Sequence, residues 1–126
     1  MNKFLISIAA FAVLLTTPPV FSKELVSEFK GSESRVTAEF EVKAPWIIDW
    51  RTNGDYPGSM GIQVSLLSSP GDEYLGKVVS TKYVDNGVKL FEEGGRYRLQ
   101  VNSSLMNWTL RVEQLTHAEA EAYSPK

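Results

Sequence analysis

Apolar and polar residues alternate one by one along most of this chain, and this period of two is the feature that most limits its fold. The pattern is clearest at residues 45–50, where Trp46, Ile48 and Trp50 fall on one face of an extended strand. Two tryptophans on one strand face indicate either a packed core or an exposed binding platform. The sequence therefore predicts β-structure and leaves the role of this face open.

Short segments with this strand pattern recur between clusters of glycine, proline, asparagine, aspartate and serine. They cover residues 25–30, 35–43, 46–51, 62–66, 75–84, 88–91, 97–101 and 108–112. The cleanest is 35–43, in which the residues expected to face the core are Val36, Ala38, Phe40 and Val42. Short strands at even spacing are typical of all-β proteins. We expect an antiparallel β-sandwich, jelly-roll or immunoglobulin-like, of about eight strands.

One turn signal is specific enough to test. Residues 85–87 read Asp-Asn-Gly, and Asn-Gly supplies the two positive φ angles that a type I′ turn needs. We therefore expect residues 75–84 and 88–91 to form a tight hairpin around this turn.

The N-terminus predicts an export signal. Lys3 is followed by an apolar run at residues 4–15 and then by a segment that ends at Ser22. An apolar run of this length would extend about 18 Å as a helix, against a hydrocarbon core of about 30 Å, which favours a cleaved signal over a membrane anchor. We predict that residues 1–22 are removed and that the mature chain is periplasmic or secreted, without membrane insertion.

The length of the mature chain limits it to one domain. We assign residues 23–115 to the β-sandwich and residues 116–126 to a helical or flexible tail, which begins with a capping box formed by Thr116 and Glu119. Cysteine is absent, so no disulfide can form.

The net charge of the mature chain is mildly negative. Loss of Lys3 changes the net charge from −2 (13 minus 15) to −3 (12 minus 15), which offers no basic surface for nucleic acid. We expect a monomer.

The residues that usually carry catalysis or hold metals are scarce. The chain has no cysteine and a single histidine, His117, so nucleophile–base pairs and transition-metal sites lack their usual groups. Its loop aspartates are ordinary turn formers and do not make a dense calcium loop. Short connections also leave little material for a cleft with paired carboxylates. We predict a protein that is not an enzyme and holds no metal or cofactor.

Aromatic side chains are the first candidates for binding. The three tryptophans share strand faces with aliphatic residues, which favours a place in the core. Tyr56 and Tyr74 lie in loops rich in glycine and aspartate, with Asp55 beside Tyr56. Because a large aromatic residue in such a loop has no periodic reason to be there, we expect these two tyrosines to make exposed contacts.

Three arginines are the second candidates. Arg96 and Arg98 share a strand face, and Arg111 lies on the strand expected to pair with theirs. Together they predict either a solvated polar face or a site for an anion or carboxylate.

Five segments form a set that spans most of the mature chain. They are Phe29-Lys30-Gly31-Ser32, Phe40-x-Val42, Pro45-Trp46 with Trp50, Gly95-x-Tyr97-x-Leu99-x-Val101 and Trp108-x-Leu110-x-Val112. This set resembles a pattern in small secreted bacterial proteins and lipoproteins of unassigned role, although Ser34 stands where glycine or threonine is usual. The resemblance implies a β-sandwich and an exported bacterial setting, and it assigns no catalytic residue.

These observations predict an exported, non-catalytic module that binds or inhibits a protein through loops at one end of the sandwich. One alternative is a carbohydrate-binding module that holds a polysaccharide on an outward-facing Trp46 or Trp50. Another is a structural accessory subunit of an envelope or secreted assembly, with an unpaired edge strand completed by another chain.

Overall fold

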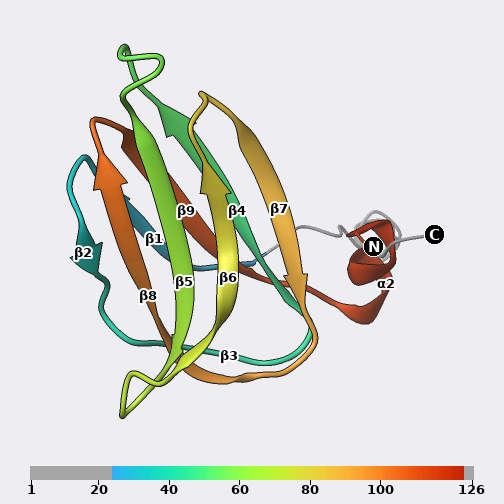
Figure 1. Ribbon diagram of the computed structural model, residues 1–126. Coiled ribbons are helices and arrows are strands. Elements are labelled where there is room, and N and C mark those ends of the chain that lie inside the picture. Colours follow the sequence, from blue (N-terminus) through green and yellow to red (C-terminus); the bar gives the residue numbers. More distant parts are fainter. Residues whose placement is uncertain (1–23, 124–126) are drawn as a thin grey trace, which may run out of the picture.

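The computed structural model describes residues 24–123, which form two β-sheets stacked face to face (Figure 1). The strands are β1 (Glu24–Gly31), β2 (Arg35–Val36), β3 (Phe40–Val42), β4 (Trp46–Asn53), β5 (Gly61–Ser68), β6 (Tyr74–Thr81), β7 (Asn86–Phe91), β8 (Gly95–Ser104) and β9 (Asn107–Gln114). A short helix, α2 (His117–Ala120), and a 3-10 turn, η2 (Glu121–Tyr123), follow β9. The predicted signal at residues 1–22 lies outside the described residues. The all-β sandwich is confirmed.

The strands pair antiparallel in both sheets. The first sheet has the order β1-β9-β4-β7, and the second has the order β2-β8-β5-β6, with β3 pairing with another part of β8. From β6 to β9 the chain changes sheet at every connection (Figure 1). Neighbours in sequence are therefore often on opposite layers, which separates residues that a simple meander would bring together.

The core lies between the sheets and is built around the tryptophans. Trp46 is fully buried and stacks on Phe91 with ring centroids 4.2 Å apart, while its indole nitrogen donates to the carbonyl of Glu93 at 2.9 Å. Trp108 is buried as well, and the half-buried Trp50 packs against the same cluster. A buried indole needs such a partner for its N–H. The core role expected for the tryptophan face is confirmed, and the exposed platform is not found.

The segment predicted as one strand at residues 35–43 is split into β2 and β3, and part of its predicted facing is wrong. Val36 is exposed and Thr37 is buried, whereas Phe40 does face the core. The hydroxyl of Thr37 accepts from the amide of Leu99 at 3.0 Å, and the Thr37 amide donates to the Leu99 carbonyl at 2.9 Å. The Thr37 hydroxyl thus accepts a hydrogen bond that a backbone carbonyl would accept in a regular ladder. The strict alternation of inward and outward side chains is interrupted between Thr37 and Phe40.

The predicted Asn-Gly hairpin turn is wrong. β6 ends at Thr81 in the second sheet, and Asn86 and Gly87 already belong to β7 in the first sheet, where Gly87 pairs with Trp50. Neither Asn86 nor Gly87 has a positive φ. Asn-Gly favours a turn locally, but here the pairing of β7 with β4 keeps both residues extended.

The predicted capping box at the start of the tail is confirmed. The amide of Glu119 donates to the hydroxyl of Thr116 at 3.1 Å, and the Thr116 amide donates to the Glu119 carboxylate at 2.8 Å. These bonds satisfy the amides of Thr116 and Glu119 at the start of α2, and η2 then contacts β7. The tail therefore returns to the sandwich within the described residues.

Candidate functional site

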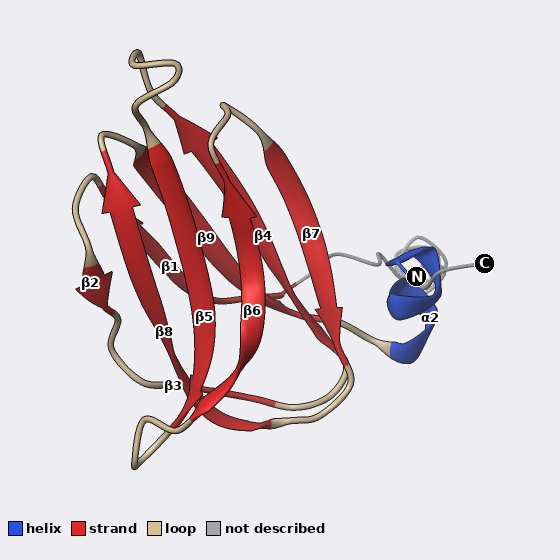
Figure 2. Cartoon of the chain, in the orientation of Figure 1, coloured by secondary structure: helices blue, strands red, loops and turns tan. Residues whose placement is uncertain are grey.

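Four loops meet at one end of the sandwich, which we call the loop end. They comprise residues 32–34, 54–60, 82–85 and 105–106, and Figure 2 shows them together at the top of the molecule. The large apolar side chains exposed there, with their exposed fractions, are Tyr56 (56%), Tyr83 (73%), Val84 (55%) and Leu105 (51%). One exposed apolar residue is ordinary, but four on neighbouring loops make a candidate contact surface.

The loop that carries Tyr83 is fixed to β4 by Thr52. The Thr52 hydroxyl accepts from the amide of Asp85 at 2.9 Å, and it lies 3.1 Å from the carbonyl of Tyr83 and 3.2 Å from that of Asp85. The Thr52 amide also donates to the Asp85 carbonyl at 2.9 Å. Because Thr52 is buried, this loop is held at a fixed point in the core, and the Tyr83 ring projects from an anchored backbone.

The loop that carries Tyr56 is anchored separately. The amides of Ser59 and Met60 donate to the Tyr56 carbonyl at 2.9 and 3.1 Å, and the Met60 side chain is buried. A Cβ on Gly54 would lie 2.8 Å from the Met60 sulfur and 3.1 Å from the Leu105 carbonyl oxygen. This close approach places the Tyr56 loop against the Leu105 loop, so the two present one continuous surface.

The two loop tyrosines predicted as binding residues lie at opposite ends of the sandwich. Tyr56 and its neighbour Asp55 belong to the loop end, and both are exposed. Tyr74 is also exposed, but it begins β6 and pairs with Leu67 near the far end of β5. The length of β5 separates the two rings by about 20 Å of strand. The prediction that both tyrosines lie in loops at a single end is therefore wrong.

The three predicted arginines do not form one patch. Arg96 and Arg98 lie on β8 of the second sheet, whereas Arg111 lies on β9 of the first sheet, so they are on opposite outer faces. Each is also paired with carboxylates. The pairs are Arg96–Glu41 at 3.9 Å, Arg98–Asp72 at 3.7 Å, Arg111–Glu28 at 3.0 Å and Arg111–Glu113 at 3.3 Å. The hydrogen bond to Glu28, and then that to Glu113, raises the pKa of Arg111 above its usual value.

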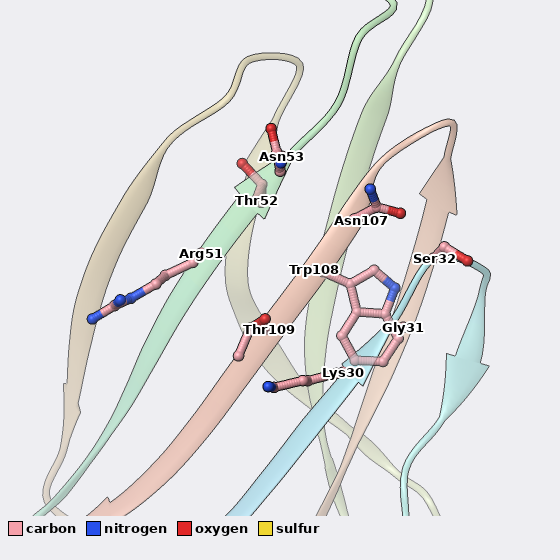
Figure 3. A pocket seen from close by; sticks show the side chains of 9 residues that line it. All are labelled: Lys30, Gly31, Ser32, Arg51, Thr52, Asn53, Asn107, Trp108 and Thr109. Carbon is pink, nitrogen blue, oxygen red and sulfur yellow. The ribbon is translucent and has the colours of Figure 1, made fainter.

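A shallow hollow of about 460 Å³ lies on the outer face of the first sheet next to the loop end, and we call it the polar hollow (Figure 3). Its lining comes from β1, β4, β9 and the start of the first loop. The lining residues are Lys30, Gly31, Ser32, Arg51, Thr52, Asn53, Asn107, Trp108 and Thr109. Seven of the nine carry an amide, hydroxyl or cationic side chain and none is a carboxylate, although apolar atoms contribute more of the exposed lining surface than polar atoms. The hollow is therefore suited to a polar ligand with negative charge.

Sequence reasoning did not place Tyr83, Val84 or Leu105 at the loop end. Tyr83 and Val84 fall in the strand predicted at residues 75–84, and Leu105 lies between the strands predicted at residues 97–101 and 108–112. One signal could have revealed the first two, because neither face of residues 75–84 is apolar throughout: Lys77 interrupts one face and Lys82 the other. A strand that ends early leaves its last residues to a loop.

Histidine and clusters of metal-binding side chains are the next features to place. His117 is exposed on α2, and within residues 24–123 no group of three or more histidine, cysteine, aspartate or glutamate side chains could hold a metal ion. In that same part of the chain, no helix is long and apolar enough to cross a membrane.

No protein-family model matches the sequence, and a search of curated proteins finds no significant relative.

Proposed function

We propose that this protein is an exported, non-catalytic module that binds another protein through the loop end. The observation that carries the proposal is the grouping of Tyr56, Tyr83, Val84 and Leu105 on adjacent loops. Tyrosine is enriched among the residues that dominate protein interfaces, because its ring offers a large contact area and has few rotatable bonds. Export is supported by the signal-like residues 1–22.

The anchoring of the loops supports the same proposal. The loop of Tyr83 is tied to the buried Thr52, and the loop of Tyr56 is tied down by the buried Met60. Ordering a flexible loop on binding costs free energy, and a loop that is already ordered avoids much of that cost. Exposed aromatic rings on anchored loops are the arrangement that gives binding surfaces their affinity.

Pairing through an edge strand fits the structure less well. β6 shifts register against β5 at two places, and β1 shifts once against β9. β2 and β3 are only two and three residues long. On β7, Lys89 pairs with Ile48, whose side chain is in the core, so a charged residue occupies an inward position of this edge. Bulges, short strands and inward charges are the features that discourage edge pairing.

Carbohydrate binding on Trp46 or Trp50 also fits the structure poorly, because neither tryptophan presents an open outward face. Trp46 and Trp108 are buried, and Trp50 packs against the core. An aromatic face must be open to solvent before a sugar ring can stack on it. We therefore place the contact surface on the loops and not on the tryptophan strand.

A capture experiment with matched tyrosine variants tests the proposal. The mature protein is immobilised and exposed to the exported protein fraction of its own cells, and captured proteins are identified by mass spectrometry. We expect a specific protein to be captured by the unchanged protein, and at least tenfold less of it by the double variant Tyr56→Ala/Tyr83→Ala. A tenfold loss corresponds to about 1.4 kcal/mol, which is more than most interface residues cost when truncated to alanine.

Tyr74→Ala is the matched control, because Tyr74 is as exposed as Tyr56 but lies at the other end of the sandwich. It should leave capture unchanged. Equal capture by all variants would overturn the proposal, and so would a loss confined to Tyr74→Ala. Circular dichroism on each variant separates a lost contact from a lost fold.

A further inference from the structure

The polar hollow is built from three neighbouring strands in register. Lys30 of β1 lies opposite Thr109 of β9, which in turn lies opposite Arg51 of β4. Adjacent strands are about 4.8 Å apart, so the backbones of Lys30 and Arg51 are separated by about 10 Å, with Thr109 between them. Asn53 and Asn107 form the next paired row toward the loop end. Two cations and three neutral hydrogen-bonding side chains thus share one small area.

The charge of this hollow is opposite to that of the chain. The protein has 15 acidic and 13 basic residues, yet the lining has two basic residues and no acidic one. Within the described part of the chain, the ammonium of Lys30 has no ion pair, in contrast to Arg96, Arg98 and Arg111. The positive charge at Lys30 is therefore available to a ligand.

Arg51 is the second available cation. Its only ion pair among the described residues is with Asp49 at 3.5 Å, and its side chain is 65% exposed. The Asp49 side chain is only 15% exposed, but the exposed guanidinium and the long contact make this a weak pair. Figure 3 shows Arg51 extending away from Lys30, so we expect Lys30 to make the main contact and Arg51 to turn toward a bound anion.

The backbone that carries Lys30 is held in place by contacts with Arg35 and Trp108. Arg35 donates a hydrogen bond to the carbonyl of Lys30 and lies over the ring of Trp108, 5.1 Å from its centroid. The indole nitrogen of Trp108 donates to the carbonyl of Glu33 at 3.1 Å. These contacts tie the end of β1 and the first loop to β9, so the lining does not need to be ordered when a ligand arrives.

We propose that the polar hollow binds a sugar acid, meaning a saccharide unit that carries a carboxylate. The carboxylate pairs with Lys30 and Arg51, and the sugar hydroxyls bond to Thr109, Asn53 and Asn107. A simple anion would use the two cations but bond to few of the amides and hydroxyls. An acidic peptide also has backbone groups that bond to them, but a sugar ring presents several hydroxyls next to its carboxylate within the small area of the hollow. This site is separate from the contact residues of the loop end, so either proposal can fail alone.

Amide chemical shifts of the ¹⁵N-labelled mature protein test this inference. The probe is digalacturonic acid, and the comparison ligands are neutral galactobiose, inorganic phosphate and a triaspartate peptide. We expect the acid to shift amides at residues 30–32, 51–53 and 107–109, with a Kd on the order of 1 mM. Neutral galactobiose, phosphate and triaspartate should each bind at least tenfold more weakly. Added salt should weaken the binding of digalacturonic acid, because salt screens the attraction between exposed charges.

Variants at the cations give the second readout. Lys30→Gln should weaken binding of the acid about tenfold, which is the expected loss of one charge-assisted hydrogen bond, and Arg51→Gln should weaken it less. Lys77→Gln is the matched control, because Lys77 is an exposed lysine on β6 of the other sheet. It should leave the titration unchanged.

Several outcomes would overturn the inference. They are the absence of shifts in the hollow at about 20 mM acid, unchanged affinity in Lys30→Gln, and equal binding of galactobiose. Phosphate or triaspartate binding as tightly as the acid would also overturn it, by pointing to an anion or an acidic protein segment instead. Because these variants do not alter Tyr56 or Tyr83, the protein-capture experiment is read independently.

Discussion

Trp50 lies directly over Gly87 on the neighbouring strand β7. The two residues are opposite one another in the register, and a Cβ placed on Gly87 would lie 2.6 Å from Cζ2 of Trp50. The same arrangement occurs at the other edge of the first sheet, where a Cβ on Gly31 would lie 2.6 Å from Cζ2 of Trp108. In both pairs an indole covers a glycine of an edge strand, a device that helps to hold register at a sheet edge.

Gly87→Ala should destabilise the protein by about 1–3 kcal/mol, because the new methyl group has to displace the Trp50 ring from its packed position. Urea unfolding followed by tryptophan fluorescence measures the change. Gly61→Ala is the control, since its Cβ would meet no atom closer than 3.8 Å and should change stability by about 0.5 kcal/mol or less. Equal effects of the two substitutions would contradict the packing role of Gly87.

Thr52→Val should loosen the loop of Tyr83. The valine keeps the shape of the side chain but removes the hydroxyl that accepts from the Asp85 amide, so we expect a loss of about 1–3 kcal/mol. Hydrogen exchange at the Asp85 amide should become faster, which NMR can measure. Thr52→Ser retains the hydroxyl and should retain most of this protection. Unchanged exchange in Thr52→Val would argue against the anchor.

Trp46→Ala should cost about 3–5 kcal/mol, because Trp46 is fully buried and stacked on Phe91. Tyr74→Ala removes another large aromatic side chain, but from an exposed position, and should cost about 0.5 kcal/mol or less. Thermal unfolding of both variants measures the contrast. A stable Trp46→Ala protein would mean that this tryptophan does not serve as a core anchor.

The free energy of unfolding should fall at alkaline pH, because Tyr97 ionises there. Burial, and then the nearby charge of Glu93, raises the pKa of Tyr97 above 10.0 in the folded chain. A raised folded-state pKa stabilises the protein fully below pH 10, and this contribution is lost as the pH rises through the folded value. Denaturant unfolding between pH 9 and 12 should show the decline, and Tyr97→Phe should reduce its slope.

Absorbance at 295 nm gives an independent check on that prediction. Tyr97 should ionise at higher pH than a tyrosine with the ordinary pKa, and this late component should be missing in Tyr97→Phe. A Tyr97→Phe protein with the same titration curve would show that the delayed ionisation belongs to another tyrosine.

Much of the local structure could be read from the sequence. The faces of Trp46 and Trp50 followed from alternation along a single strand, and the Thr116–Glu119 capping box followed from a spacing of three residues. Such signals succeed because their cause lies within a few residues of chain. The Asn86-Gly87 turn shows the limit, because pairing with β4 outweighed a strong local preference.

The candidate site was less predictable, because it depends on which sheet each strand joins. Arg98 and Arg111 were expected to be neighbours, since their strands follow one another in sequence, but the chain changes sheet between β8 and β9. The same kind of crossing turns Tyr83 into a loop residue beside the loop of Tyr56. Sheet membership is decided by contacts between distant segments, and alternation carries no information about it.

The sequence by itself determined that this chain is an all-β protein, where most of its strands lie and which residues share a strand face with its tryptophans. Period-two patterning dictates these features, because adjacent side chains of a strand must point to opposite sides. Only the tertiary structure decided the order of the strands, the grouping of Tyr56 with Tyr83 and Leu105, and the placement of Lys30 and Arg51 on either side of β9. These groupings arise when two sheets bury their apolar faces against each other, which no short stretch of sequence encodes.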